Sequence, residues 1–173
     1  MTSLPTQTSL KQRRIAWHKV LPVASLIAFI ILFDQVTKFI VRQRMYLGQS
    51  WPDDWPIRFT RVNNSGSAFG LFDDQTIFLI IASIIAIGVM VFFYRQASGA
   101  GSGLLRFSLG LQLGGAVSNL ADRIRDGHVT DFIELPRWPV FNVADSAITI
   151  GIVMLVVVVL FFDRSRHKAK PAP

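Results

Sequence analysis

The segment Ser118–Asp145 reads SNLADRIRDGHVTDFIELPRWPVFNVAD, and it separates two long apolar runs of the chain. Its polar side chains stand at or near the ends of those runs: Asn119, Asp122, Arg123, Asp131, Asn142 and Asp145. An ionisable side chain at the centre of a membrane helix costs about 2.5–3.5 kcal/mol, so such groups are usually kept for a function. We therefore interpret this segment as the functional centre of a membrane protein.

The composition limits the possible chemistry. The chain has 173 residues, 51% of them hydrophobic, which predicts a single integral membrane domain spanning 1–173. It has no cysteine, which excludes disulfides, a thiol nucleophile and a cysteine-ligated metal. Its three histidines show no metal-ligand spacing, so we expect neither a metal nor a cofactor.

The apolar runs predict an all-α membrane protein with four transmembrane helices, at about 20–41, 76–94, 104–121 and 143–162. A cleaved signal peptide is the alternative for the first run, but the run is long and no small-residue cleavage site follows it. Residues 42–74 carry a loosely alternating stretch, Ile57–Val62, which suggests a short strand. We expect a small β-containing extramembrane platform between the first two helices; a plain connecting loop is the alternative.

The distribution of basic residues predicts the topology. The N-terminal arm, the 95–106 return and the C-terminal tail hold 10 Lys/Arg and one acid, whereas segments 42–74 and 122–142 hold 7 Lys/Arg and 8 acids. The positive-inside rule places both basic termini in the cytoplasm and the polar segment at the outer face. This accounts for the net charge of +7 without nucleic-acid binding, which we do not expect.

Several polar residues have plausible structural roles. Asp34 and Lys38 are four apart and can pair on one face of the first helix. Asp122 fits a salt bridge or cap at a helix end, and Asn142 fits the N-cap of the fourth helix. Asp145, three residues further on, could equally bind first-turn amides. The third helix carries two stripes of four-residue spacing, which are Gly110, Gly114 and Ser118, and Gly115, Asn119 and Arg123.

Asp131 and Asp145 are candidates for a catalytic pair. Pro136 and Pro139 lie between them, so a chain that turns back is needed to bring them together. Two carboxylates in one site share a proton, and the pair can then activate water and protonate a carbonyl or a leaving nitrogen. A metal site that includes His128 and a proton- or ion-coupled carrier that uses the same acids remain alternatives at this point.

Five ordered motifs resemble the lipoprotein signal peptidases, the type II signal peptidases of bacteria. They are DQVTK (34–38), NSGSAF (64–69), GGAVSNLADR (114–123), GHVTDF (127–132) and FNVAD (141–145), and they cover most of the chain between about 30 and 150. One motif alone would be weak, but the ordered set is specific. Ser118 stands where glycine is common and Ser67 where alanine is common, and the connection between Asp131 and Asp145 looks short. These departures leave substrate preference open.

The resemblance implies an aspartyl endopeptidase of the bacterial inner membrane. It implies that the substrate is a diacylglyceryl prolipoprotein, cut just before the lipidated cysteine, with Asp131 and Asp145 as the catalytic dyad. Residues expected to bind substrate or support the dyad are Asn64, Gly66, Gly115, Asn119, Arg123 and Asn142. Asp34, Lys38 and Asp122 are expected to be structural polar residues. Beyond substrate and membrane lipids we expect no partner, and the protein to be a monomer.

Overall fold

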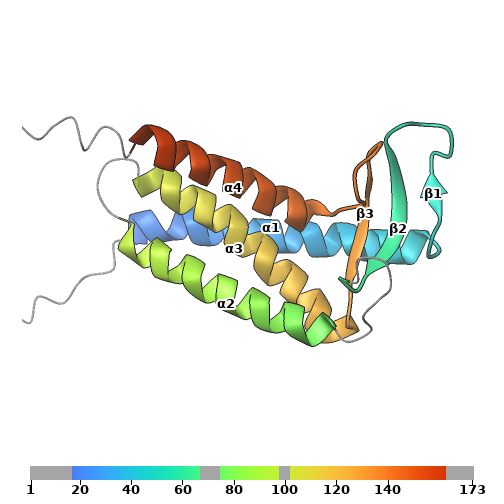
Figure 1. Cartoon of the computed structure of the whole chain (residues 1–173), viewed down its shortest axis with the longest axis horizontal. Coiled ribbons are helices and arrows are strands. Elements are labelled where there is room, and N and C mark those ends of the chain that lie inside the picture. Colours follow the sequence, from blue (N-terminus) through green and yellow to red (C-terminus); the bar gives the residue numbers. More distant parts are fainter. Residues whose placement is uncertain (1–16, 67–74, 98–101, 163–173) are drawn as a thin grey trace, which may run out of the picture.

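The computed structural model describes residues 17–66, 75–97 and 102–162. The predicted basic termini, as well as Ser67, lie outside these residues. The described helices are α1 (Trp17–Arg44), α2 (Gln75–Gln96), α3 (Ser102–Asp126) and α4 (Val143–Phe162). They run side by side as a bundle, with a small sheet at one end (Figure 1). All four predicted helices are therefore present.

Three of the helices are long and apolar enough to cross a membrane: Val20–Arg44, Thr76–Gln96 and Val143–Phe161. Helix α3 does not meet that description because it carries buried polar side chains, among them Ser108, Gln112 and Ser118. It packs against α1, α2 and α4, so much of its surface faces protein. A helix shielded in this way does not need an apolar surface. The transmembrane placement of α3 stays a prediction.

Small residues allow the close packing of α3. A Cβ atom added at Gly110 would lie 2.9 Å from Val23 of α1, and one at Gly114 would lie 3.0 Å from Ile30 of the same helix. On another face, a Cβ at Gly115 would lie 2.4 Å from the carbonyl oxygen of Ala144 in α4. The stripe that contains Gly110 and Gly114 therefore contacts α1, and the stripe that contains Gly115 contacts α4.

The sheet has three antiparallel strands in the order β1 (Ser50–Trp51), β2 (Arg58–Asn64) and β3 (Val129–Glu134). The predicted β-containing segment between the first two helices is present as β1 and β2, but the sheet also takes in β3, which comes from the connection between α3 and α4. An isolated two-stranded ribbon is marginally stable, and β3 supplies the third strand. Its sequence, VTDFIE, is rich in β-branched and aromatic residues, which is the signal that could have identified it.

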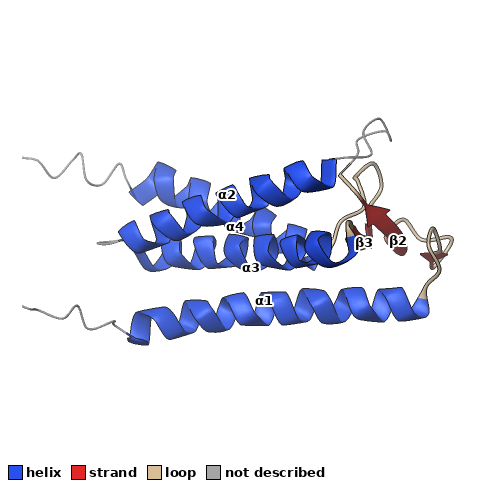
Figure 2. Ribbon diagram, turned by 90° about the horizontal axis from the view of Figure 1, so that it is seen from below, coloured by secondary structure: helices blue, strands red, loops and turns tan. Residues whose placement is uncertain are grey.

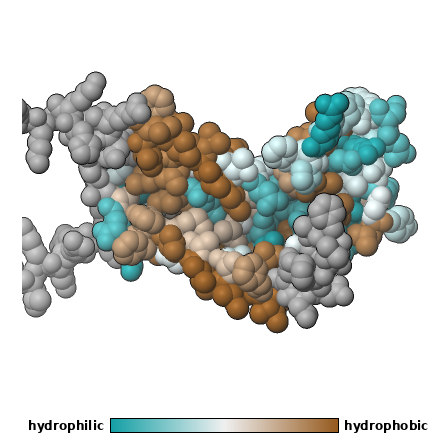
Figure 3. All heavy atoms as spheres, in the orientation of Figure 1, coloured by the Kyte–Doolittle hydropathy of each residue, from teal (hydrophilic) through white to brown (hydrophobic). Residues whose placement is uncertain are grey.

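The end of α1 lies against this sheet and extends past the ends of α3 and α4 (Figure 2). Arg61 of β2 donates hydrogen bonds to the carbonyl oxygens of Arg42 and Met45, which caps the end of α1. Arg42 in turn donates to the hydroxyl of Thr130 in β3. Apolar side chains dominate the helical part of the visible surface, and hydrophilic ones gather at the sheet end (Figure 3).

Candidate active site

Asn142 connects the two candidate catalytic aspartates. Its side-chain nitrogen donates to Asp131 Oδ1 at 2.6 Å, and its side-chain oxygen accepts the backbone N–H of Asp145 at 2.9 Å. Asp145 Oδ2 accepts the backbone N–H of Asn142 at 3.2 Å, which completes a reciprocal capping arrangement at the start of α4. The predicted N-cap role of Asn142 is confirmed. One fully buried residue thus positions a carboxylate on β3 and another in the first turn of α4.

Asn119 of α3 holds the second carboxylate. Its side-chain nitrogen donates to Asp145 Oδ1 at 2.8 Å. Its oxygen accepts hydrogen bonds from Lys38 Nζ at 2.7 Å and from Asn142 Nδ2 at 3.2 Å. Asn119 thus uses its oxygen twice and one N–H of its amide within the site, and α1, α3 and α4 all contribute to the orientation of Asp145.

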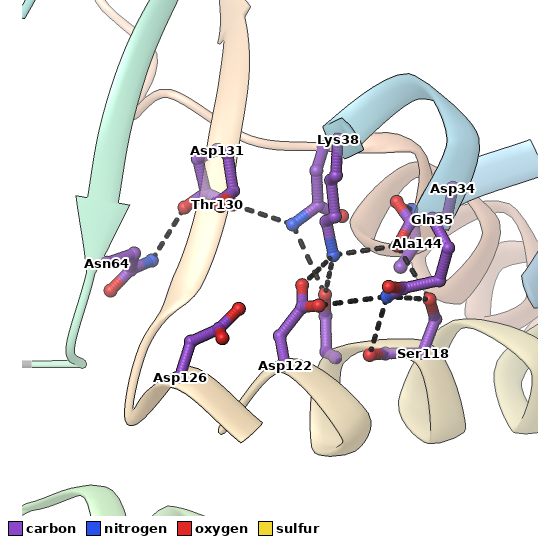
Figure 4. Close-up of polar contacts among 12 residues, drawn as sticks. Asp34, Gln35, Lys38, Asn64, Ser118, Asp122, Asp126, Thr130, Asp131 and Ala144 are labelled. Atoms are coloured by element: carbon purple, nitrogen blue, oxygen red, sulfur yellow. Dashed lines mark hydrogen bonds and ion pairs between the residues drawn. The ribbon is translucent and has the colours of Figure 1, made fainter. Parts of the chain in front are cut away.

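Asn64 of β2 holds the other carboxylate, since its side-chain nitrogen donates to Asp131 Oδ2 at 2.8 Å (Figure 4). The Asn64 oxygen accepts the backbone N–H of Gly66 at 2.8 Å. Gly66 has a φ of +81°, and an added Cβ would lie 2.0 Å from the side chain of Leu79. Only glycine fits this turn without strain.

A buried ion network lies next to the two candidate catalytic aspartates and is linked to Asp145 through Asn119. Lys38 Nζ is 2.7 Å from Asp34 Oδ2 and 2.7 Å from Asp122 Oδ2, and all three side chains are fully buried (Figure 4). The predicted Asp34–Lys38 pair is confirmed. Asp122 does form a salt bridge, but its partners are Lys38 and, at 3.2 Å, Arg125 rather than the adjacent Arg123.

Two further side chains, which the sequence did not single out for this role, complete the network. Gln35 donates to Asp122 Oδ1 at 2.9 Å and to the hydroxyl of Ser118 at 3.0 Å. Ser118 donates to Asp34 Oδ2 at 2.7 Å. The family that the sequence resembles commonly has glycine at position 118. Here the Ser118 hydroxyl has a defined hydrogen-bond partner. Gln35 lies one residue after Asp34 in the DQVTK motif, which was the available signal.

A groove of about 540 Å³ between α2, α3 and α4 opens onto this site. Its polar lining residues are Ser83, Gln112, Asn119, Arg123 and Asp145, and the remaining lining is apolar. Among the described residues, none accepts a hydrogen bond from the buried Arg123 Nε. Asp145 also lines a second hollow of about 400 Å³. The carboxylate is thus accessible from two apolar spaces.

Burial raises the pKa of Asp131 to about 6, despite the opposing hydrogen bonds from Asn64 and Asn142. The negative charge of Asp145 contributes to this rise in the pKa of Asp131. A carboxyl group with this pKa can hold or release a proton near neutral pH, as a general acid or base requires. Within the described residues no three His, Asp or Glu side chains converge as metal ligands, so the site with His128 is not formed.

Gly115 lies in the contact between α3 and α4 one turn before Asn119. An added Cβ would also approach Ile148 Cγ1 to 2.8 Å. In the described structure, Gly115 therefore allows the close contact between α3 and α4, one turn of α3 before Asn119. The structure brings the other predicted site residues together around the aspartates, either in hydrogen bonds or in the groove.

Comparison with known proteins finds relatives over most of the chain. A family model described as Signal peptidase (SPase) II matches residues 26–161. The lipoprotein signal peptidase of Halothermothrix orenii is 37% identical over 131 residues, covering 75% of this chain and 89% of the relative. That of Pelotomaculum thermopropionicum is 41% identical over 132 residues, covering 75% and 86%.

The fold also matches a solved structure. A bacterial membrane enzyme determined by the in meso method at 2.3 Å resolution superposes with a TM-score of 0.73 at 29% identity, covering 92% of this chain and 96% of that one. A second such structure, at 1.9 Å resolution, gives a TM-score of 0.72 at 28% identity, covering 85% and 95%. The family match over most of the chain and this shared fold show that the chain belongs to the signal peptidase II family, the lipoprotein signal peptidases.

Proposed function

We propose that this protein is an intramembrane aspartyl endopeptidase that removes the signal peptide from diacylglyceryl-modified prolipoproteins, cutting before the lipidated cysteine. The observation that carries the mechanism is the position of Asp131 and Asp145 on either side of Asn142, which binds both. Family membership supports the protease activity and the prolipoprotein substrate.

In the proposed reaction the aspartates share one proton. The ionised carboxylate takes a proton from water, whose oxygen attacks the scissile carbonyl, while the protonated carboxyl donates a hydrogen bond to the carbonyl oxygen. Collapse of the tetrahedral intermediate breaks the C–N bond, and the dyad supplies a proton to the leaving nitrogen. Asn119 and Asn142 keep the carboxylates oriented throughout.

The groove between α2, α3 and α4 suits the lipidated substrate. Its apolar walls match acyl chains, and the Arg123 guanidinium that lines the groove would donate a hydrogen bond to a carbonyl oxygen of the peptide. Asn64 and Gly66 belong to the sheet end, which would hold the peptide above the dyad.

Cleavage assays with purified variants test the dyad. Asp131→Asn and Asp145→Asn each keep the side-chain size but remove a carboxylate, so we expect cleavage of a diacylglyceryl prolipoprotein to fall by at least about 10²-fold. Asp126→Asn is the matched control, because Asp126 is exposed and forms its ion pair with Arg125. Wild-type rates in either dyad variant would overturn the assignment.

The proposal includes a topology of four membrane spans, with α3 as the third, both termini in the cytoplasm of the bacterial inner membrane and the site at the outer face. The chain is proposed to work as a single-domain monomer. Because the chain has no cysteine, single replacements give clean labelling sites. In intact spheroplasts a membrane-impermeant maleimide should label Asp54→Cys and should not label Gly103→Cys. The reverse pattern would invert the topology.

The carrier alternative finds no support in the described residues. A relay needs ionisable groups across the depth of the bundle. The buried polar side chains deeper in α3, Ser108 and Gln112, hydrogen-bond to carbonyl oxygens of their own helix. The buried ion network instead lies close to the sheet end, near the candidate dyad.

A further inference from the structure

A second apolar groove, of about 440 Å³, lies between the end of α1 and the sheet. One stripe of α1 forms one wall, because Thr37, Ile40, Val41 and Arg44 follow helical spacing along one face. The sheet supplies Trp51, Phe59 and Phe132, of which the two phenylalanines stack at 6.4 Å. The volume lies within the range of about 300–1,000 Å³ that is typical of ligand sites.

This groove is separate from the candidate active site. Side chains alternate between the two faces of a strand, so Asp131 and Phe132 of β3 point in opposite directions. Asp131 points to Asn64 and Asn142, whereas Phe132 lines the groove next to α1. No residue that lines this groove also lines the groove that contains Asp145.

The position of the groove exposes it to the membrane interface. It lies at the last turns of the apolar segment Val20–Arg44, where α1 extends past α3 and α4 (Figure 2). Ile40 is 51% exposed and Trp51 is 64% exposed, so the groove continues the apolar outer surface of α1. Tryptophan is enriched where a membrane protein meets the lipid headgroups.

Arg44 gives the groove a charge preference. Its side chain is exposed, and among the described residues no hydrogen bond or ion pair of its guanidinium is found. The neighbouring cations are in use, since Arg42 donates to Thr130, Arg58 pairs with Glu134 and Arg61 caps α1. A free guanidinium at the rim of an apolar groove matches a phosphate that is attached to an acyl chain.

We propose that this groove is a binding site for an anionic glycerophospholipid of the surrounding membrane, with one acyl chain between α1 and the sheet and the phosphate on Arg44. Lipid bound there would brace the end of α1 against β3. Because β3 carries Asp131 on its other face, lipid composition would act on the sheet end of the enzyme without entering the substrate groove.

Tryptophan quenching by brominated lipids tests the proposal directly, because Trp51 lines the groove. Two proteins that each keep one tryptophan are compared: one with Trp51, and one with Trp138, which is equally exposed at 64%. Trp138 lines neither this groove nor the adjoining apolar hollow that Trp51 and Phe59 share with Trp55. The other tryptophans are replaced by phenylalanine. The full-length chain is placed in phosphatidylcholine bilayers with increasing amounts of brominated phosphatidylglycerol or brominated phosphatidylcholine.

We expect quenching of Trp51 to saturate at a low fraction of brominated phosphatidylglycerol, while quenching of Trp138 follows the bulk lipid fraction. Arg44→Gln should raise the half-saturating fraction about fivefold. Arg95→Gln removes a charge at the other end of the bundle, at the end of α2, and should change nothing.

Four results would overturn the proposal. Parallel quenching of Trp51 and Trp138 would mean that the groove only meets bulk lipid. An unchanged half-saturating fraction in Arg44→Gln would show that Arg44 does not bind the phosphate. Equal quenching by the two brominated lipids would show that the groove does not select an anionic headgroup. Relief of Trp51 quenching by a diacylglyceryl lipopeptide would assign the groove to substrate acyl chains instead.

Discussion

Asp34 of α1 accepts the backbone N–H of Ala144 of α4 at 2.8 Å, across 110 residues of sequence. The first amides of a helix have no partner within the helix, and Ala144 immediately precedes Asp145. A carboxylate is well suited to this position because it also meets the positive end of the helix dipole. Asp34 therefore fixes the turn of α4 that carries the candidate catalytic aspartate, while its other oxygen binds Lys38 and Ser118.

Asp34→Ala should lower the free energy of unfolding by about 1–3 kcal/mol, because it leaves the buried Ala144 amide without its acceptor, while Lys38 keeps Asp122 and Asn119 as partners. The change is measured by unfolding the detergent-solubilised protein with heat or with denaturant. Asp126→Ala is the control, since it removes an acid from an exposed pair with Arg125, and such pairs contribute about 0–1 kcal/mol. Equal stability losses in the two variants would contradict the structural role of Asp34.

The raised pKa of Asp131, about 6, predicts the alkaline side of the pH–rate profile. A dyad that works with one shared proton loses activity when the second carboxyl ionises, so kcat/KM should fall as the pH rises through about 6. The value belongs to the coupled pair rather than to one residue. An alkaline limb far above pH 6 would contradict the environment described for Asp131.

Asn64→Ala should move this alkaline limb to higher pH. The hydrogen bond from Asn64 stabilises the ionised form of Asp131, so its loss favours the protonated form and raises the pKa of Asp131 further. Asn63→Ala is the control, because Asn63 precedes Asn64 on β2 and points to the other face of the sheet. A shift to lower pH, or an equal shift in both variants, would contradict the assignment.

Much of this arrangement follows from the sequence pattern. Long apolar runs predict α1, α2 and α4, and the ladder of Gly110, Gly114 and Ser118 predicts a close helix contact of α3, which is the contact with α1. The N-cap role of Asn142 is local and follows from its place three residues before Asp145. Local features of this kind are visible because their partners are near in sequence.

Contacts between distant segments are not visible in this way. Asp122 pairs with Lys38, which lies on a different helix, although the adjacent Arg123 looks like the obvious partner. Strand β3 was missed because a strand of six residues gains its stability from β2, more than sixty residues earlier in the chain. Such partners depend on how the helices pack, which one sequence does not specify.

Lys38→Met should lower kcat more than it changes KM. Lys38 is a positioning residue, because it donates to Asn119, which in turn donates to Asp145. The variant also leaves Asp34 and Asp122 as two buried acids without their shared cation, so stability should fall by about 3–5 kcal/mol.

The double variant Lys38→Met/Asp122→Asn separates the two effects. It removes one of the buried acids, so part of the stability should return, whereas kcat should stay low because Asn119 still lacks its donor. Thermal unfolding and steady-state cleavage of a lipopeptide measure the two quantities. Recovery of kcat together with stability would show that Lys38 acts only through folding.

Gly115→Ala tests whether the spacing of α3 and α4 sets the geometry of the site. The added methyl would meet the Ala144 carbonyl oxygen at 2.4 Å, so the helices must separate next to Asp145. Overpacking of this kind costs about 1–3 kcal/mol, and the shift should also lengthen the Asn119–Asp145 hydrogen bond and lower kcat. Gly88→Ala in α2 is the matched control, because a Cβ there meets nothing within 4 Å and alanine favours the helix by about 0.5–1 kcal/mol. Normal activity in Gly115→Ala would mean that the site tolerates a change in helix spacing, and that Asn142 alone is sufficient to hold Asp145 in place.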